Sequence, residues 1–262
     1  MTSMEPALVL QSYRTHDVAP WIAQCLTGVQ AWAVAAGHDY EFVDDRLFEL
    51  VPAWFRERCG AARLPQTDLA RLLLMRARLA AGARRVIWID ADVLVCAPAR
   101  LVLDGVRGFA FCAETWLERD ACGELHAQRR INNAVMVMDA GNPILDFYIH
   151  ACLTNAAHLA PGDIGKLEFG PQLLTRLAQV TPLPVIGCVG MLSPPLAHDL
   201  AAGGGPACAA YARARGQRIG AINLCASLVG VDGGVDTATV TAAMACLVET
   251  GGDAINQHVA SS

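Results

Sequence analysis

Two carboxylates directly follow a run of four apolar residues. Val86 to Ile89 lead into Asp90-Ala91-Asp92. Burial of an unpaired carboxylate is costly, so two acids at the end of a core strand need a compensating charge. Mg²⁺ or Mn²⁺ would supply it, because these cations combine one or two carboxylates with phosphate oxygens and waters. The pair therefore predicts a divalent-metal site for a diphosphate; the plainer alternative is that an aspartate caps the following turn.

A third acid lies upstream, together with an arginine. Leucines recur with helical spacing after Thr67, which predicts a helix from Asp68 to Ala81 with Thr67 as its cap. Asp68 and Arg71 share one face of that helix. There the acid can accept sugar hydroxyls, and the arginine can meet a phosphate or another acid. A surface ion pair is the alternative, but this helix leads straight into the strand that carries the aspartate pair.

The elements that would position these residues alternate along the chain. Strands are expected at 7–11, 40–43, 86–89, 108–112, 134–138, 183–186 and 219–224, and helices at 20–36, 68–81, 143–158 and 171–180. Such alternation predicts one α/β domain with a mostly parallel sheet flanked by helices. Ligands of open α/β sheets bind outside the carboxyl ends of the strands, which is where the aspartate pair would lie.

Composition excludes some partners. The 262 residues carry a net charge of −5, and no basic run is longer than a pair such as Arg84-Arg85, so nucleic acid is not expected as a partner. No apolar run reaches the roughly 18 residues of a membrane span, and the first residues lack a secretory pattern. We therefore expect a cytoplasmic protein that acts in solution or peripherally at the inner face of the membrane.

The aspartate segments resemble a known family. Thr67-Asp68-Leu69-Ala70-Arg71, followed by Trp88-Ile89-Asp90-Ala91-Asp92, is similar to the S-D-x-x-R … Y-x-D-x-D block of glycosyltransferase family 32. That family contains Golgi mannosyltransferases and bacterial capsular polysaccharide sugar transferases, and is related to glycogenin-like and clostridial toxin glucosyltransferases. Weaker similarities lie at 6–15, 131–134, 141–143, 170–175 and 221–224. Two departures are Trp88 in place of the usual tyrosine and Asn223 in place of a late histidine that often binds metal.

The resemblance implies a GT-A type, Rossmann-like fold over residues 1–262. Residues 6–100 would form the nucleotide-sugar half, 101–230 the acceptor half and 231–262 a C-terminal helical tail. The implied activity is transfer with retention from a nucleotide-sugar, with UDP favoured over GDP and with Mn²⁺ or Mg²⁺ on the D-x-D motif. The acceptor would be a hydroxyl of a glycan, a lipid-linked saccharide or a small molecule, as in bacterial polysaccharide biosynthesis.

The resemblance also implies a role for each matching position. Gln11, Ser12 and Tyr13 would line the base and ribose. Asp68 and Arg71 would hold the donor sugar and phosphate. Asp90 would bind the ribose and the metal, and Asp92 would bind the metal. Asn132 and Asn133 would face the sugar or acceptor, and Asn223 would offer its carbonyl oxygen to the metal.

Glu114 is a further candidate that the residues themselves suggest. It follows the expected strand at 108–112, where it would either contact an acceptor hydroxyl or simply lie at the sheet rim.

Two other functions compete with glycosyl transfer. A catalytically weak descendant of the same fold would bind sugar nucleotides or a partner protein without turnover. A phosphatase of the haloacid dehalogenase type also uses D-x-D after an apolar strand, but it requires Gly-Thr soon after the second aspartate, where this chain has Val93-Leu94. The donor sugar, the acceptor and the oligomeric state are not specified by the sequence.

Overall fold

The largest sheet has six strands. The computed structural model describes residues 6–160 and 162–259, and its main sheet has the order β2-β1-β3-β6-β5-β7. These strands are β2 (Asp39–Val43), β1 (Leu8–Ser12), β3 (Arg85–Ile89), β6 (Leu125–Asp139), β5 (Phe109–Arg119) and β7 (Val185–Ile186). All run in one direction except β6, which is antiparallel to both of its neighbours. The prediction of a mostly parallel sheet is confirmed.

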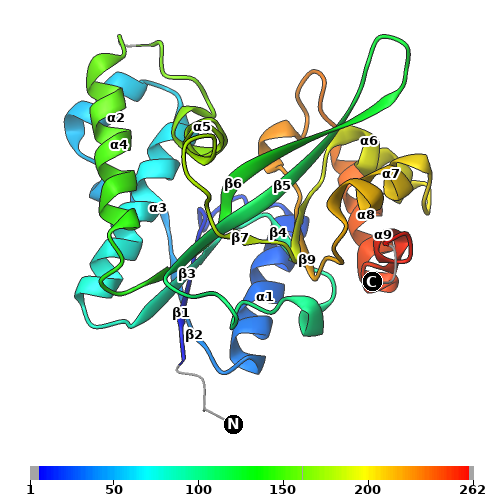
Figure 1. Ribbon diagram of the computed structural model, residues 1–262, viewed down its shortest axis with the longest axis horizontal. Helices are drawn as coiled ribbons and strands as arrows, with labels where there is room; N and C mark the ends of the chain where they lie inside the picture. The colour runs from blue at the N-terminus through cyan, green and yellow to red at the C-terminus, as the bar shows by residue number, and fades with distance from the viewer. Residues whose placement is uncertain (1–5, 161, 260–262) are drawn as a thin grey trace.

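Helices cover both faces of this sheet. On one face, α3 (Arg63–Ala80) packs against β3, and α2 (Ala53–Cys59) and α4 (Ile144–His158) pack against α3, so that their apolar residues share one core cluster with Val86 and Trp88. On the other face, α1 (Pro20–Ala35) packs against Ile87 and Ile89. Since alternate residues of a strand point to opposite faces, the four-residue apolar run is explained by burial on both sides. In Figure 1, α2, α3 and α4 lie together at the left of the sheet.

A second, smaller sheet forms the right-hand part of the molecule. It has the order β4-β9-β8, formed by β4 (Val93–Val95), β9 (Ala221–Asn223) and β8 (Val189–Met191). The helices α6 (Pro194–Ala201), α7 (Pro206–Arg215), α8 (Thr237–Glu249) and α9 (Asp253–Asn256) gather beside it (Figure 1). The predicted helical tail therefore corresponds to α8 and α9, whose buried Leu247 and Ile255 belong to a continuous apolar core.

Three predicted elements have clearly different bounds in the structure. Helix α3 begins at Arg63 rather than Asp68, and Thr67 lies inside it, where its hydroxyl donates to the Arg63 carbonyl at 3.1 Å. Thr67 is thus not a cap. The strands expected at 108–112 and 134–138 extend into a long hairpin, with Arg119 paired to Leu125 near the turn. This hairpin projects to the upper right in Figure 1.

Helix α5 (Leu173–Ala178) follows a single π-helical turn at Glu168–Gln172, and a 3-10 helix at Asp45–Leu50 packs on α3.

Within residues 6–160 and 162–259, none of the helices has both the length and the apolar character needed to cross a bilayer.

Candidate active site

The predicted residues converge on one cleft of about 710 Å³ at the carboxyl end of β3. The cleft lies between the ends of β1 and β3, the first turns of α3, the β5–β6 hairpin and the turn after β9. Its walls include all of the predicted site residues except Gln11, namely Ser12, Tyr13, Asp68, Arg71, Asp90, Asp92, Asn132, Asn133 and Asn223. Segments far apart in the sequence therefore bring these side chains into one space.

Gln11 lies beneath this cleft instead of facing it. Its side chain is fully buried: the amide nitrogen donates to the Asp90 carbonyl at 3.2 Å, and the amide oxygen accepts from the Tyr40 hydroxyl at 3.1 Å. A residue with no exposed surface cannot contact a base or ribose in this arrangement. Gln11 therefore supports the backbone of the aspartate pair, which corrects its expected place beside the nucleotide.

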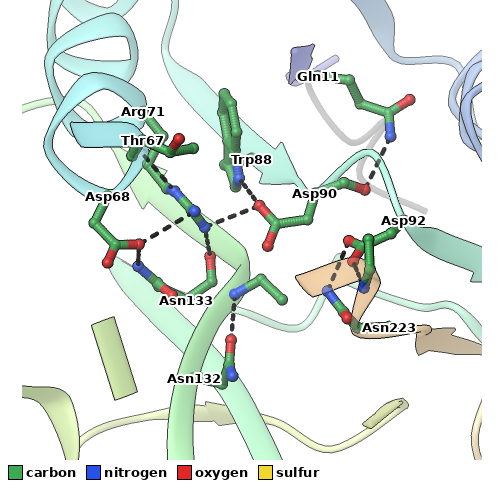
Figure 2. Close-up of polar contacts among 12 residues, drawn as sticks. Gln11, Thr67, Asp68, Arg71, Trp88, Asp90, Asp92, Asn132, Asn133 and Asn223 are labelled. Atoms are coloured by element: carbon green, nitrogen blue, oxygen red, sulfur yellow. Dashed lines mark hydrogen bonds and ion pairs between the residues drawn. The ribbon is translucent and has the colours of Figure 1, made fainter. Parts of the chain in front are cut away.

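Arg71 is the central cation of the site (Figure 2). Its Nη1 donates to Asp90 Oδ1 at 2.8 Å and to the Asn133 carbonyl at 3.0 Å, and its Nη2 lies 3.2 Å from Asp68 Oδ1. The guanidinium also lies over the Trp88 ring, 5.4 Å from its centroid. Only 4 % of Arg71 is exposed, so its planar guanidinium connects Asp68 on α3 to Asp90 at the end of β3 with little contact with water.

Trp88 has a second contact, a hydrogen bond from its indole to Asp90. Its Nε1 donates to Asp90 Oδ1 at 2.6 Å, so Oδ1 accepts from both the indole and Arg71. In the described part of the chain, both hydrogen bonds to the Asp90 side chain reach Oδ1. Oδ2 is therefore left to face the cleft, as drawn in Figure 2.

Asp68 is held from a second direction by β6. The Asn133 amide donates to Asp68 Oδ1 at 2.9 Å, and it lies 3.4 Å from the Tyr148 hydroxyl, which in turn donates to the Phe169 carbonyl at 2.5 Å. The next residue, Gly170, packs tightly here, because a Cβ at that position would lie 3.0 Å from Asn133 Oδ1. Tyr148 was not predicted as part of the site, and no spacing in the sequence marks it.

Asp92 is held by the turn that follows β9. Asn223 Nδ2 donates to Asp92 Oδ1 at 3.0 Å, and the Ala226 backbone N–H donates to Asp92 Oδ2 at 2.7 Å. The side-chain oxygen of Asn223, Oδ1, accepts from the Cys225 backbone N–H at 2.7 Å. The structure therefore places the Asn223 amide nitrogen, rather than its oxygen, toward Asp92.

The three acids are short of positive charge. Burial raises the pKa of Asp68 to about 6, despite the opposing effect of Arg71. Burial also raises the pKa of Asp92 to about 6, and the neighbouring charge of Asp90 adds to this shift. The pKa of Asp90 is raised by burial as well. One arginine among three acidic side chains leaves an excess of negative charge that a bound cation would relieve.

The donor set suits a hard cation with few protein ligands. Among the described residues, no group of three or more His, Cys, Asp or Glu side chains could enclose a metal ion. Asp90 and Asp92 nevertheless provide oxygen ligands on one wall of an open cleft, and Oδ2 of Asp90 has no other partner in the described chain. Mg²⁺ typically takes one or two carboxylates and completes its shell with substrate phosphates and waters, so the pair fits Mg²⁺ or Mn²⁺.

Glu114 forms a separate polar group on the hairpin side of the cleft. It lies inside β5 rather than at a strand end, with 6 % of its surface exposed. Asn132 Nδ2 donates to Glu114 Oε2 at 2.7 Å, and Arg130 Nη1 lies 3.7 Å from Oε1. The Asn132 side-chain oxygen accepts from the Ala134 N–H at 2.7 Å. Asn132 therefore orients Glu114, and burial raises the pKa of this carboxyl.

Comparison with known proteins gives structural neighbours. No protein-family model matches the sequence, and no curated protein aligns with it. The chain is similar to a glycosyltransferase involved in the glycosylation of the major capsid of PBCV-1, with a TM-score of 0.34 and 11 % identity; the alignment covers 55 % of this chain and 66 % of that one, just under two thirds of its length. It is also similar to apo mouse xyloside xylosyltransferase 1, with a TM-score of 0.42 and 11 % identity, over 85 % of this chain and 98 % of that one. Both of these structural neighbours are glycosyltransferases.

Proposed function

We propose that this protein is a glycosyltransferase that moves a sugar from a nucleoside diphosphate sugar to a hydroxyl acceptor. One observation carries the proposal: Asp90 and Asp92 lie together in an open cleft where β3 ends, and among the described residues the corner that they form with Asp68 contains one arginine, Arg71. Three acids with one arginine would repel a bare diphosphate, and a divalent cation bound at the pair would offset that repulsion. UDP is the favoured nucleotide and GDP the second choice, on the strength of the sequence resemblance.

Asp90 and Asp92 would hold Mg²⁺ or Mn²⁺, which when bound would neutralise the diphosphate as it leaves. Arg71 favours the ionised forms of Asp90 and Asp68, against the effect of burial on their pKa values, and fixes their positions through its contacts at 2.8 and 3.2 Å. Asp68 and Asn133 then form a rigid, hydrogen-bonded wall beside the cation site, suited to the hydroxyls of the donor sugar. Ser12 and Tyr13, at the end of β1, remain the proposed contacts of the base and ribose.

The acceptor would enter from the hairpin side. Glu114 lines the cleft there and is already oriented by Asn132, so it can accept a hydrogen bond from an acceptor hydroxyl. Retention of the anomeric configuration follows from the resemblance, and same-face attack, with the departing phosphate taking the hydroxyl proton, is the mechanism we propose. The chain's contribution would be positioning and charge neutralisation.

A panel of UDP- and GDP-sugars, screened by thermal shift with and without Mn²⁺, tests the proposal. A ligand that binds only the native state raises the melting temperature, and we expect a Mn²⁺-dependent rise with one nucleotide class. Asp92→Asn should abolish it. Asp146→Asn is the matched control, since that aspartate lies on α4 with 74 % of its side chain exposed. A rise that needs no Mn²⁺, or that survives Asp92→Asn, would contradict the proposal.

A descendant that binds sugar nucleotides without turnover is the second candidate. One observation favours it: both oxygens of Asp92 already accept a hydrogen bond from the protein. Release of free UDP or GDP from the donor that gives the thermal shift separates the two. Binding with Mn²⁺-dependent release indicates an enzyme, whereas saturable binding with no release over many hours indicates the binding protein.

A further inference from the structure

We infer that Asn223, Cys225 and Ala226 form a clamp that positions Asp92, and that Asn223 acts as a positioning residue instead of a metal ligand. The inference rests on the proposed function, because it concerns how the cation site is kept ready. The clamp comprises the last residue of β9 and the turn that follows it.

The backbone places Asn223 against the aspartate. Strand β9 is antiparallel to β4, with Asn223 paired to Val93, and the Leu224 N–H donates to the Asp92 carbonyl at 2.9 Å. On its other side, the Asn223 carbonyl accepts from the Leu192 N–H at 2.8 Å. Asn223 is thus fixed within the smaller sheet, and with 5 % exposure it has little room to turn.

The orientation of the Asn223 side-chain amide is determined by its contact with the backbone N–H of Cys225. A backbone N–H can only donate, so the atom that lies 2.7 Å from the Cys225 nitrogen must be the side-chain oxygen. The amide nitrogen then faces Asp92 Oδ1 at 3.0 Å. To ligate a metal bound at Asp92, Asn223 would have to turn its oxygen toward the carboxylate, which would remove its N–H donor from Asp92 Oδ1.

Cys225 has the backbone conformation that makes this geometry possible. Its φ of 55° and ψ of 55° are left-handed, which is uncommon for a residue other than glycine. Such conformations cost free energy and persist where the surroundings require them. Here the left-handed turn directs two successive N–H groups inward, that of Cys225 to Asn223 and that of Ala226 to Asp92 Oδ2 at 2.7 Å.

The result is one N–H donor on each oxygen of Asp92, which fixes the plane of the carboxylate. Each carboxylate oxygen has a second lone pair, so the clamp leaves Asp92 able to bind a cation. Partners that orient a metal-binding carboxylate typically change metal affinity by about 10- to 100-fold when they are removed. A non-ligating asparagine can therefore control the site where the family places a ligating histidine.

The test is calorimetric titration of Mn²⁺ into the protein with saturating UDP, and separately with GDP. We expect Asn223→Ala to weaken Mn²⁺ binding about 10-fold or more. Asn142→Ala is the matched control, since the Asn142 side chain accepts from the Ile144 N–H at 3.0 Å in a similar local turn outside the cleft.

Crystals of the wild-type Mn²⁺ complex give a second readout that does not depend on folding of a variant. The clamp predicts that Asn223 Oδ1 remains on the Cys225 N–H and stays outside the metal's coordination shell. Unchanged Mn²⁺ affinity in Asn223→Ala, or Asn223 Oδ1 coordinated to the metal, would overturn the clamp and leave the proposed function standing. Wild-type protein that binds neither Mn²⁺ nor a nucleotide would overturn both. If Asn223→Ala does not fold, Asn223→Ser, which is too short to reach Asp92, replaces it.

Discussion

The guanidinium of Arg71 on α3 lies 2.8 Å from the Asp90 carboxylate at the end of β3, and both side chains are largely removed from water. This pair joins the helix that carries Asp68 to the strand that carries the aspartate pair. The contact aligns two elements whose relative position decides the shape of the cleft.

Replacement of Arg71 tests that role. Arg71→Met would leave Asp68 and Asp90 buried without their cation, and breaking a buried charge pair in this way costs about 3–5 kcal/mol of unfolding free energy. Arg76→Met is the control, because Arg76 lies on the same helix with 51 % of its side chain exposed and a 3.7 Å contact to Asp146. It should change stability by no more than about 0.5 kcal/mol. Urea unfolding measures both free energies. Equal losses of unfolding free energy in the two variants would contradict the role of Arg71 in joining α3 to β3.

Gly170 packs closely against the Asp68–Asn133 pair. A Cβ there would lie 3.0 Å from Asn133 Oδ1 and 3.2 Å from Asp68 Oδ2, so Gly170→Ala must shift these side chains by a few tenths of an ångström. We expect a loss of about 1–3 kcal/mol in stability and weaker donor binding. Gly165→Ala is the matched control in the same loop, since its Cβ would meet Glu168 only at an ordinary 3.8 Å. Donor affinity by calorimetry should fall for Gly170→Ala alone; an unaffected Gly170→Ala would show that this packing does not shape the donor site.

Acidic pH should weaken Mn²⁺ binding and stabilise the metal-free protein. The pKa values of Asp68 and Asp92 are raised to about 6, above the unfolded value of 3.8, because both are buried. Between these values the folded protein holds protons that the unfolded chain has released, so the free energy of unfolding decreases as pH rises toward 6 and beyond. A cation needs the ionised carboxylates, so its affinity should fall as pH drops below about 6.

Thermal melts with and without Mn²⁺ from pH 5 to 8 measure both trends. Without metal, Asp92→Asn should melt a few degrees above the wild type at pH 7.5, because it removes a buried charge, and the difference should shrink toward pH 5. A metal-free protein whose stability rises steadily from pH 5 to 7.5 would contradict the assigned shifts.

Lys166 gives a chemical probe of the same cleft. It is the only lysine in the sequence, and it lines the cleft. A water-soluble amine-acylating reagent should therefore modify one side chain, and bound Mn²⁺-UDP should slow that modification at least severalfold. Peptide mass spectrometry follows Lys166, with the N-terminal amine as the internal control for reagent loss. Equal rates with and without nucleotide would place the nucleotide away from Lys166.

Much of the fold could be predicted because its signals are local. Pro20 and Gly37 bracket α1 to within one or two residues, and the apolar run before Asp90 marks a strand buried on both faces. The beginning of α3 could not be predicted, because Thr67 has the residue type of a cap and the true start at Arg63 has no side-chain cap. The length of the β5–β6 hairpin depends on packing of Leu117 against the distant α6–α8 core, which no local pattern contains.

The residues that line the cleft could be predicted from the sequence better than the contacts that each of them makes. The acids and Arg71 stand out because charged residues beside apolar runs need partners. Burial decides that Gln11 supports the Asp90 backbone, and the left-handed turn at Cys225 decides which end of the Asn223 amide faces Asp92. Both depend on three-dimensional surroundings that single residue types do not encode.

We propose that Asp90 and Asp92 together hold the cation of a nucleoside diphosphate. Anomalous scattering from a crystal soaked with Mn²⁺ and UDP tests this most directly. We expect an anomalous peak between the Asp90 and Asp92 carboxylates, in contact with Asp90 Oδ2 and with the diphosphate oxygens. Ordered UDP in the cleft with no peak at these two residues, or Mn²⁺ bound elsewhere while both carboxylates keep only their present protein partners, would contradict it.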